Sequence, residues 1–264
     1  MSDTIVKCKA VFFDIDGTFY DHVTNQILPS SIQAVKELKE KGYKVALCSG
    51  RPLRMAKELP LFENISWDGF VGSAGNVVYD ENLNILVKKG FADEELQNIF
   101  SIAKEKDIAC YVNGEDVYLT KDDEEAKKVL KQFHVEIPKE IREYKTGDQV
   151  EMISMFKGYD YDYSAFLKVK DLRLQKSSGV IMDIVKNGVN KAHGIDALME
   201  YWGLKEHGYI AFGDSMNDKE MLEHANIGIA MENGDEALFS YADHVCGPSH
   251  KDSIYQMLKK MHVL

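Results

Sequence analysis

A run of four apolar residues, Ala10 to Phe13, leads directly into two aspartates one residue apart, Asp14 and Asp16, followed by Gly17-Thr18. Such a run is typical of a short strand buried on both faces. Side chains two positions apart on an extended chain project to the same side, so both carboxylates are expected at one point beyond the strand. No fold requires two such charges there, and we therefore expect a positively charged group beside them.

The N-terminal part alternates strands and helices. A helix is expected from Pro29-Ser30, where Ser30 and Gln33 have the spacing of a capping box. The next apolar run, Val45 to Cys48, predicts a second strand that leads into Ser49-Gly50-Arg51-Pro52, and Pro52 suits the first turn of another helix.

The C-terminal part resumes this alternation. Asn190 is placed to cap a helix, residues 209–212 read as a strand entering Gly213-Asp214, and residues 227–230 and 244–246 look like two further strands. Alternation of this kind predicts an α/β fold with a doubly wound parallel sheet and helices on both faces.

The middle of the chain is predicted to be an insertion. Apolar residues at helical spacing, first in residues 96–103 and then in 126–133, indicate two amphipathic helices. The strand candidates around them are residues 108–112, 117–120, 150–156, 172–175 and 180–185. Turn-rich segments bound this region. We therefore predict a core of residues 1–83 and 185–264, interrupted by a second α/β unit of residues 84–184.

Composition excludes several classes of protein. The 264 residues carry 32 Lys and Arg against 43 Asp and Glu, a net charge of −11, which does not fit a nucleic-acid-binding protein. The opening Met1 to Thr4 is polar and no apolar run approaches membrane length, so we expect neither a signal peptide nor a membrane-spanning helix. The four scattered cysteines favour reduced thiols. The sequence predicts a cytoplasmic protein that is a monomer or a weak homo-oligomer.

Four polar clusters are expected to share one crevice. Three of them follow predicted strands, Asp14 with Asp16, residues 49–51 and residues 214–218, and Lys191 starts a predicted helix. Ligands of open parallel sheets bind beyond the carboxyl ends of the strands. If Asp14 and Asp214 lay about 4 Å apart, their repulsion would be about 4 kcal/mol at an effective dielectric near 20. A cation would relieve it, and oxygen donors alone suit Mg²⁺.

Each cluster also has a structural explanation when it is taken alone. Turn or capping roles would suit Asp14, Asp16, Ser49, Asp214 and Asp218, a solvated surface position would suit Lys191, a surface salt bridge would suit Arg51, and His22 and His193 are interpreted as structural. The functional interpretation is favoured because all four clusters fall at the same end of one predicted sheet.

The motifs at residues 14–18, 49–51, 191 and 213–218 resemble the four ordered motifs of the haloacid dehalogenase superfamily, specifically its Cof-type phosphatases. The resemblance implies a Rossmann-like, haloacid dehalogenase-like core and a large inserted α/β cap that sets substrate specificity. The chain departs from the family pattern at residues 72–76, Gly-Ser-Ala-Gly-Asn, where Asn-Gly-Ala is frequent.

The resemblance also implies roles for individual residues. Asp14 would be the nucleophile, and Asp16 would act as the general acid and base while its carbonyl contacts the metal. The implied metal ligands are Asp14, Asp16, Asp214 and Asp218, the last either ligating or orienting. The implied phosphate-binding residues are Ser49, Gly50, Lys191 and Asn217.

The sequence thus predicts a Mg²⁺-dependent phosphatase of small phosphorylated metabolites, with sugar phosphates the favoured class and no nucleic-acid or membrane partner. A phosphomutase and a catalytically idle sensor of phosphorylated ligands are the alternatives. The specificity residues of the insertion stay open among Tyr111, Asn113, Glu115, Tyr118, Arg173 and Lys176.

Overall fold

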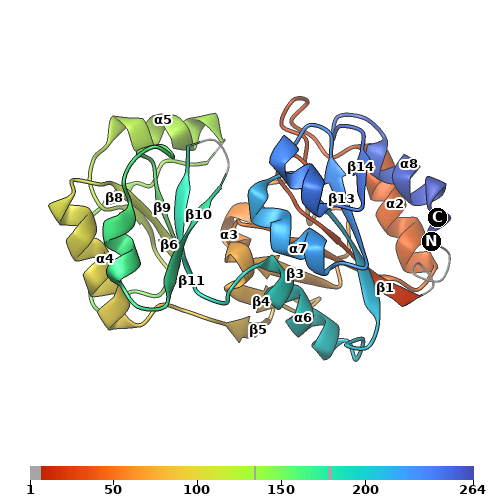
Figure 1. The fold of residues 1–264 in the computed structure, drawn as a ribbon, viewed down its shortest axis with the longest axis horizontal. Helices are drawn as coiled ribbons and strands as arrows, with labels where there is room; N and C mark the ends of the chain where they lie inside the picture. The colour runs from red at the N-terminus through yellow and green to blue at the C-terminus, as the bar shows by residue number, and fades with distance from the viewer. Residues whose placement is uncertain (1–6, 134, 178–179) are drawn as a thin grey trace. The chain divides into compact units, whose positions relative to one another are not determined.

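The computed structural model describes residues 7–133, 135–177 and 180–264, so the polar opening Met1 to Thr4 lies outside the described residues. The chain forms two compact units, one made of Met1–Lys88 and Asn190–Leu264 and the other of Lys89–Val189 (Figure 1). No helix in the described ranges is both long and apolar enough to span a bilayer.

An eight-stranded sheet runs through the first unit in the order β14-β13-β12-β1-β2-β3-β4-β5. Its strands are β1 (Cys8–Phe13), β2 (Lys44–Cys48), β3 (Gly69–Gly72), β4 (Val77–Tyr79), β5 (Ile85–Lys88), β12 (Gly208–Gly213), β13 (Ile227–Met231) and β14 (His244–Cys246). The strands from β14 to β3 are parallel, and β4 and β5 each pair antiparallel with the strand before them.

Helices cover both faces of this sheet (Figure 1). The helices of the first unit are α2 (Pro29–Glu40), α3 (Leu53–Ala56), α6 (Lys191–Tyr201), α7 (Lys219–His224) and α8 (Ser253–Lys260). Val11 and Phe13 of β1 belong to the apolar cluster that contains α2 and α8, whereas Ala10 and Phe12 belong to the one with α6 and α7. Successive residues of β1 therefore face opposite layers, which confirms the doubly wound α/β fold.

The start of α2 differs from the prediction. The helix begins at Pro29, its N-cap is Leu28, and no side chain caps it. The hydroxyl of Ser30 has no hydrogen-bond partner among the described residues. The predicted capping box is therefore wrong, because Pro29 already provides a first helical residue with a fixed φ and no N–H to satisfy.

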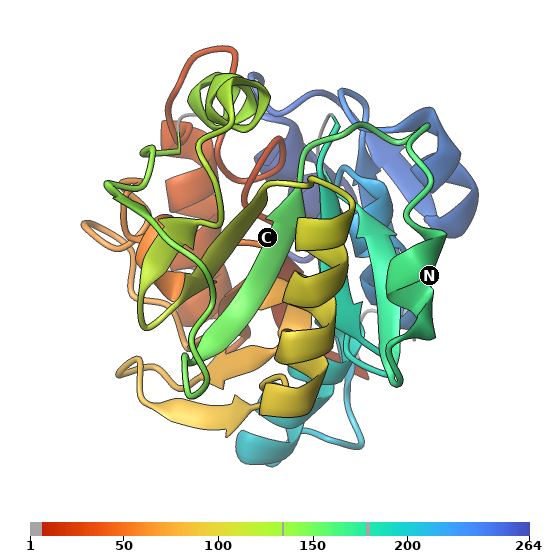
Figure 2. The same cartoon turned by 90° about the vertical axis from the view of Figure 1, so that its left-hand side faces the viewer.

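The second unit contains a six-stranded sheet in the order β10-β11-β9-β6-β7-β8. Its strands are β6 (Cys110–Gly114), β7 (Val117–Leu119), β8 (Glu140–Ile141), β9 (Val150–Met155), β10 (Leu172–Lys176) and β11 (Met182–Lys186). The helices are α4 (Asp93–Glu105) and α5 (Glu124–Gln132), with a 3₁₀ turn η2 (Ser164–Lys168). α4 lies across the strands (Figure 2), and its Leu96 and Ile99 share a core with Val112, Ile153 and Ile184.

The insertion begins later than residue 84. Residues 85–88 form β5, whose Val87 pairs with Val78 and whose Lys88 pairs with Val77, so this segment completes the sheet of the first unit. β5 is short and half exposed, which leaves only a weak strand pattern in the sequence.

Both ends of the insertion lie at the carboxyl end of β3. Lys88 pairs with Val77, which itself pairs with Gly72, the last residue of β3. A 3₁₀ turn, η1 (Ser73–Gly75), separates β3 from β4. A Cβ on Gly75, the last residue of this turn, would lie 2.1 Å from the carbonyl oxygen of Asn190, where the chain returns from the insertion. Glycine is needed there because its φ is +98° and because the returning chain approaches so closely.

Candidate active site

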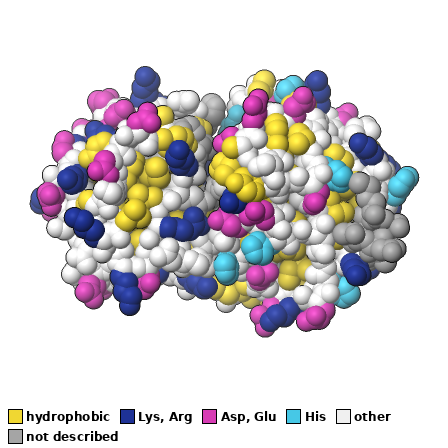
Figure 3. All heavy atoms as spheres, viewed as in Figure 1, with side chains coloured by type: hydrophobic (Ala, Val, Ile, Leu, Met, Phe, Trp, Pro, Cys, Tyr) yellow, Lys and Arg dark blue, Asp and Glu magenta, His cyan; other side chains and the backbone are white. Residues whose placement is uncertain are grey.

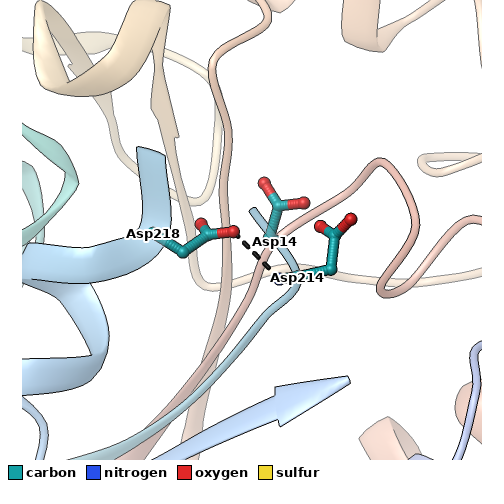
Figure 4. Close-up of side chains that lie close together, drawn as sticks. All are labelled: Asp14, Asp214 and Asp218. Atoms are coloured by element: carbon teal, nitrogen blue, oxygen red, sulfur yellow. Dashed lines mark hydrogen bonds between the residues drawn. The ribbon is translucent and has the colours of Figure 1, made fainter. Parts of the chain in front are cut away.

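Asp14 and Asp214 stand at the carboxyl ends of the adjacent parallel strands β1 and β12. The N–H of Asp14 donates to the carbonyl of Phe212 at 2.9 Å, which continues the pairing of the two strands by one residue. Asp14, Asp214 and Asp218 each place a carboxylate oxygen within 4.8 Å of the others (Figure 4). The sequence-based expectation that Asp14 and Asp214 lie together at one edge of the sheet therefore matches the geometry.

Gly17 makes room for Asp214. A Cβ at Gly17 would lie 2.5 Å from Oδ2 of Asp214, and the residue has a φ of +79°. The hydroxyl of Thr18 donates to Oδ1 of the same carboxylate at 3.3 Å. The Gly-Thr pair that follows Asp16 is therefore explained by the position of a side chain almost 200 residues away in the sequence.

Lys191 is buried at the centre of this cluster. Asn190 caps α6 by accepting a hydrogen bond from the N–H of His193 at 3.0 Å, so Lys191 is the first helical residue. Its ammonium donates to Oδ1 of Asp14 at 2.6 Å and to Oδ1 of Asp218 at 2.5 Å. Burial alone would lower the pKa of Lys191, but the two carboxylates outweigh it and hold the pKa above its ordinary value. Lys191 is thus a permanent cation and not a surface lysine.

Asp218 uses both of its carboxylate oxygens within the protein. Oδ1 accepts from Lys191, and Oδ2 accepts from the N–H groups of Asp214 and Ser215 at 3.0 and 3.1 Å. Asn217 places its Oδ1 3.2 Å from the Lys191 ammonium. These contacts favour the orienting role of Asp218 over direct ligation, because a carboxylate that already accepts three hydrogen bonds has little capacity left for a metal.

The cluster carries an excess of negative charge. Burial, followed by the neighbouring Asp218, raises the pKa of Asp14 to about 7, and burial with Asp14 raises the pKa of Asp214 well above its usual range. The raised pKa values show that one ammonium does not compensate three ionised carboxylates, which together would leave two negative charges. A divalent cation would balance them, and a donor set made only of oxygen atoms fits Mg²⁺.

Ser49 and Gly50 follow β2, the strand next to β1. The N–H of Ser49 donates to the carbonyl of Val71 at 2.8 Å, and its buried hydroxyl accepts from the N–H of Arg51 at 3.0 Å. Ser49 does not cap a helix, because the N-cap of α3 is Pro52. A Cβ on Gly50 would lie 3.5 Å from Nδ2 of Asn217, so this loop lies beside the loop after β12.

Asp16 is held by two side chains whose roles were not predicted. The guanidinium of Arg51 donates to both of its oxygens, and Nε2 of His22 lies 2.7 Å from Oδ1. Burial raises the pKa of Asp16, but the Arg51 charge outweighs burial and holds the pKa well below its ordinary value. The sequence left a surface salt bridge and a ligand contact equally open for Arg51; the structure shows a salt bridge, but with Asp16 and in a buried position. The sequence did place Arg51 near Asp16, because Arg51 follows β2, the strand beside β1.

Comparison with known proteins identifies the family. The profile of the haloacid dehalogenase-like hydrolases matches residues 11–258, a range that includes every residue of the site described above. The chain belongs to this family. It is 27% identical over 258 residues to the YkrA protein of Bacillus subtilis (strain 168), covering 97% of this chain and 98% of YkrA.

Two further comparisons concern phosphatases. The 5-amino-6-(5-phospho-D-ribitylamino)uracil phosphatase YitU of Bacillus subtilis (strain 168) is 26% identical over 268 residues, covering 96% of this chain and 97% of YitU. The solved structure of a sugar phosphatase of haloacid dehalogenase subclass IIB superposes with a TM-score of 0.83 at 26% identity, covering 97% of this chain and all of that one. Like these relatives, the chain is a hydrolase that acts on phosphate esters.

Proposed function

We propose that this phosphatase hydrolyses phosphomonoesters of small metabolites, sugar phosphates above all, through a phosphoryl group carried on Asp14. The observation that supports the proposal most directly is the buried contact between Asp14 and Lys191 beside Asp214. An anionic nucleophile approaches an anionic phosphate only where fixed positive charge offsets their repulsion, and Lys191 supplies such charge without exposure to water.

In the first step, a carboxylate oxygen of Asp14 attacks phosphorus and the bond from phosphorus to the alcohol oxygen breaks. The alcohol leaves with a proton from Asp16. In the second step, a water molecule attacks the phosphorus of the aspartyl-phosphate and gives a proton back to Asp16. The bond between phosphorus and the Asp14 oxygen breaks, so that phosphate is released and the Asp14 carboxylate is restored. Lys191, Asn217 and the Ser49 loop would bind the phosphoryl oxygens in both steps.

Mg²⁺ would be held by the side chains of Asp14 and Asp214 and by the carbonyl of Asp16, and it would supply positive charge to the transferring phosphoryl oxygens. Asp218 would orient the loop of Asp214 and the ammonium of Lys191 through the hydrogen bonds described above. We also propose that the second unit selects among leaving groups, since the roles proposed for the residues around Asp14 concern only phosphate and metal.

The two proposed roles of Asp16 require different protonation states. With its pKa held low by Arg51, the carboxylate is ionised, as a general base must be, but the same pairing makes it a weak base. To donate a proton to the leaving alcohol, Asp16 must first be protonated, which weakens its pairing with Arg51. We therefore expect the contact between Asp16 and Arg51 to loosen when a substrate is bound.

The test is phosphate release from p-nitrophenyl phosphate and from a panel of phosphorylated metabolites, with Mg²⁺ and with excess chelator. Mass spectrometry of the quenched reaction should locate one added phosphoryl group on the peptide that contains Asp14. Hydrolysis that persists in chelator would contradict the metal assignment. Conversion of a sugar phosphate to its isomer without phosphate release would identify a phosphomutase instead.

A further inference from the structure

A hairpin turn follows Asp16. Asp21 and Gln26 pair in it through backbone hydrogen bonds of 3.0 and 3.2 Å. His22 is the first residue of the tip of this turn, and Val23, the next residue, is 76% exposed. An exposed tip gains little order from packing, so a side chain that lies there keeps one orientation only if the turn is anchored elsewhere.

The carboxylate of Asp21 supplies an anchor of this kind. On the face of the molecule shown in Figure 3, Asp and Glu side chains lie exposed among Lys and Arg, as solvated charges usually do. Asp21 is instead only 2% exposed. Its Oδ2 accepts from the N–H and the hydroxyl of Thr24, both at 2.6 Å, and its Oδ1 accepts from the hydroxyl of Ser249 at 2.7 Å. Burial raises the pKa of Asp21, but these hydrogen bonds outweigh it and hold the pKa below its ordinary value, so Asp21 is an ionised acceptor.

Ser249 contacts Asp21 from a distant strand of the same sheet. It follows the edge strand β14, which β13 and β12 separate from β1. Ser249 is buried, and its N–H donates to Oδ1 of Asn233, in the loop after β13, at 2.7 Å. Nδ2 of Asn233 in turn donates to the carbonyl of Gly17 at 2.8 Å. The turn after Asp16 is therefore tied, at Gly17 and at Asp21, to the loops that follow β13 and β14.

The two anchored residues flank a contact between side chains. Gly17 directly follows Asp16 in the chain. Asp21 directly precedes His22, whose Nε2 lies 2.7 Å from Oδ1 of Asp16. Since an ionised carboxylate only accepts hydrogen bonds, Nε2 of His22 is the donor. The rings of Tyr20 and His22 meet in a T-shaped arrangement with their centroids 5.2 Å apart, which restricts the rotation of His22. A shift of either anchor would therefore move this donor away from Asp16.

We propose that Ser249 is a positioning residue for Asp16, the acid and base of the proposed reaction. Its buried hydrogen bond to Asp21 fixes the turn, and the turn holds His22 against the Asp16 carboxylate. The inference rests on the proposed function. Arg51 binds the same carboxylate from the loop after β2, and its pairing weakens when Asp16 is protonated. The contact with His22 then keeps the carboxyl group oriented while its proton is transferred.

The first experiment measures kcat/KM of the full-length protein with Mg²⁺ on p-nitrophenyl, phenyl and benzyl phosphate, whose leaving oxygens become more basic in that order. A more basic leaving oxygen depends more strongly on the proton from Asp16. Ser249→Ala should therefore lower kcat/KM about tenfold for benzyl phosphate but less than about twofold for p-nitrophenyl phosphate. Equal losses on all three substrates, or no loss on any of them, would overturn the inference.

Two further serine variants serve as rescue and control. Ser249→Thr keeps the hydroxyl and should restore the leaving-group dependence of the parent. Ser240→Ala, at an exposed position of the 3₁₀ turn η4 (Glu236–Tyr241), is the matched control, because the serine hydroxyl that it removes donates only locally, to the carbonyl of Ala237 at 3.1 Å. Ser240→Ala should behave like the parent on all three substrates. A leaving-group-dependent loss in Ser240→Ala would show that the effect is not specific to Ser249 and would overturn the inference.

The second experiment removes the donor itself. The side chain of His22 is 30% exposed, so His22→Leu should fold even if Ser249→Ala does not. His22→Leu should show the same leaving-group-dependent loss, and His22→Gln, whose Nε2 can donate in place of the ring nitrogen, should recover most of it. The double variant His22→Leu with Ser249→Ala should lose no more than His22→Leu alone, because Ser249 acts through His22. Strictly additive losses would show that Ser249 acts by another route and would overturn the inference.

Failure of the proposed function and failure of this inference give different results. If the parent hydrolyses none of the three phosphates with Mg²⁺, the proposed function fails, and this inference fails with it. If the parent hydrolyses them but the variants at Ser249 and His22 lose activity regardless of the leaving group, the proposed function stands and the positioning role of Ser249 is overturned.

Discussion

The guanidinium of Arg51 binds the carboxylate of Asp16 through two parallel hydrogen bonds, from Nε to Oδ2 at 2.7 Å and from Nη2 to Oδ1 at 2.8 Å. Bidentate pairing fixes the plane of a carboxylate as well as its charge. Arg51 is therefore a positioning residue for the proposed acid and base, and it comes from the loop after β2, whereas Asp16 lies in the loop after the neighbouring strand β1.

Arg51→Lys should retain the charge but lose the bidentate geometry. We expect kcat on alkyl phosphates to fall about 10- to 100-fold with a smaller change in KM, because Asp16 is no longer held in one orientation. Steady-state kinetics would measure this effect. Arg54→Lys, at an exposed position three residues later, is the control and should behave like the parent. A change confined to KM would instead place Arg51 in substrate binding.

Asp14→Asn should leave a folded protein without turnover, because the amide keeps the shape of the side chain but cannot attack phosphorus. Since burial and Asp218 already disfavour the ionised form of Asp14, loss of its charge should not lower the melting temperature. Phosphate release and thermal unfolding are the two measurements. Turnover near the parent rate would show that another residue is the nucleophile.

Lys191→Met should destabilise the first unit by about 3–5 kcal/mol, because Asp14 and Asp218 would lose the buried cation that they share. Adding Asp218→Asn should recover part of this loss, since one of the two unpaired charges is then removed. The free energy of unfolding of the parent, the two single variants and the double variant, measured without Mg²⁺, gives a double-mutant cycle for this pair. Strictly additive losses would mean that Lys191 and Asp218 do not act as a pair.

Mg²⁺ affinity should increase from pH 6 to pH 8. The pKa of Asp14 is raised to about 7, so below that pH the metal must displace a proton, and above it the carboxylate is already ionised. Calorimetric titration with Mg²⁺ should show that, below about pH 7, the affinity falls about tenfold per pH unit for each proton that the metal displaces. A pH-independent affinity would contradict the raised pKa of Asp14.

Ca²⁺ should bind but support little turnover, because it prefers more ligands at longer distances.

Asp183→Asn should stabilise the protein more at pH 7.5 than at pH 4.5. Burial raises the pKa of Asp183 to about 6, above that of the unfolded chain, so the parent loses stability as the pH rises from about 4 through 6. The amide does not titrate and escapes this loss, which amounts to at most about 3 kcal/mol. The difference in melting temperature between variant and parent, measured at both pH values, should therefore increase with pH.

The sequence predicted the elements that carry strong local patterns. The apolar runs before Asp14 and Asp214 and the cap at Asn190 are short-range signals, and all three appear in the structure as expected. Because parallel strands end at one edge, their positions also predicted that these polar clusters converge.

The contacts of Arg51 and His22 with Asp16 could not be predicted in the same way, although the position of Arg51 after β2 placed it at the correct edge of the sheet. Each depends on the register between strands or on how a loop folds back, and neither leaves a periodic pattern in the sequence. β5 was assigned to the insertion for the same reason, since a four-residue edge strand is recognisable only by its partner β4. The start of α2 shows a different limit, because the capping-box spacing of Ser30 and Gln33 competes with the stronger preference of Pro29 for the first helical position.

The close approach of Gly75 to Asn190 and the pairing of Lys88 with Val77 bring the two ends of the insertion to neighbouring positions on the first unit. For the stability of the first unit, the segment of about 100 residues between these ends therefore acts like a long surface loop. The entropy cost of closing a loop grows only slowly with its length. The intervening segment can therefore change in size and surface chemistry while the register of β1, β2 and β12, which positions Asp14 and Asp214, stays the same.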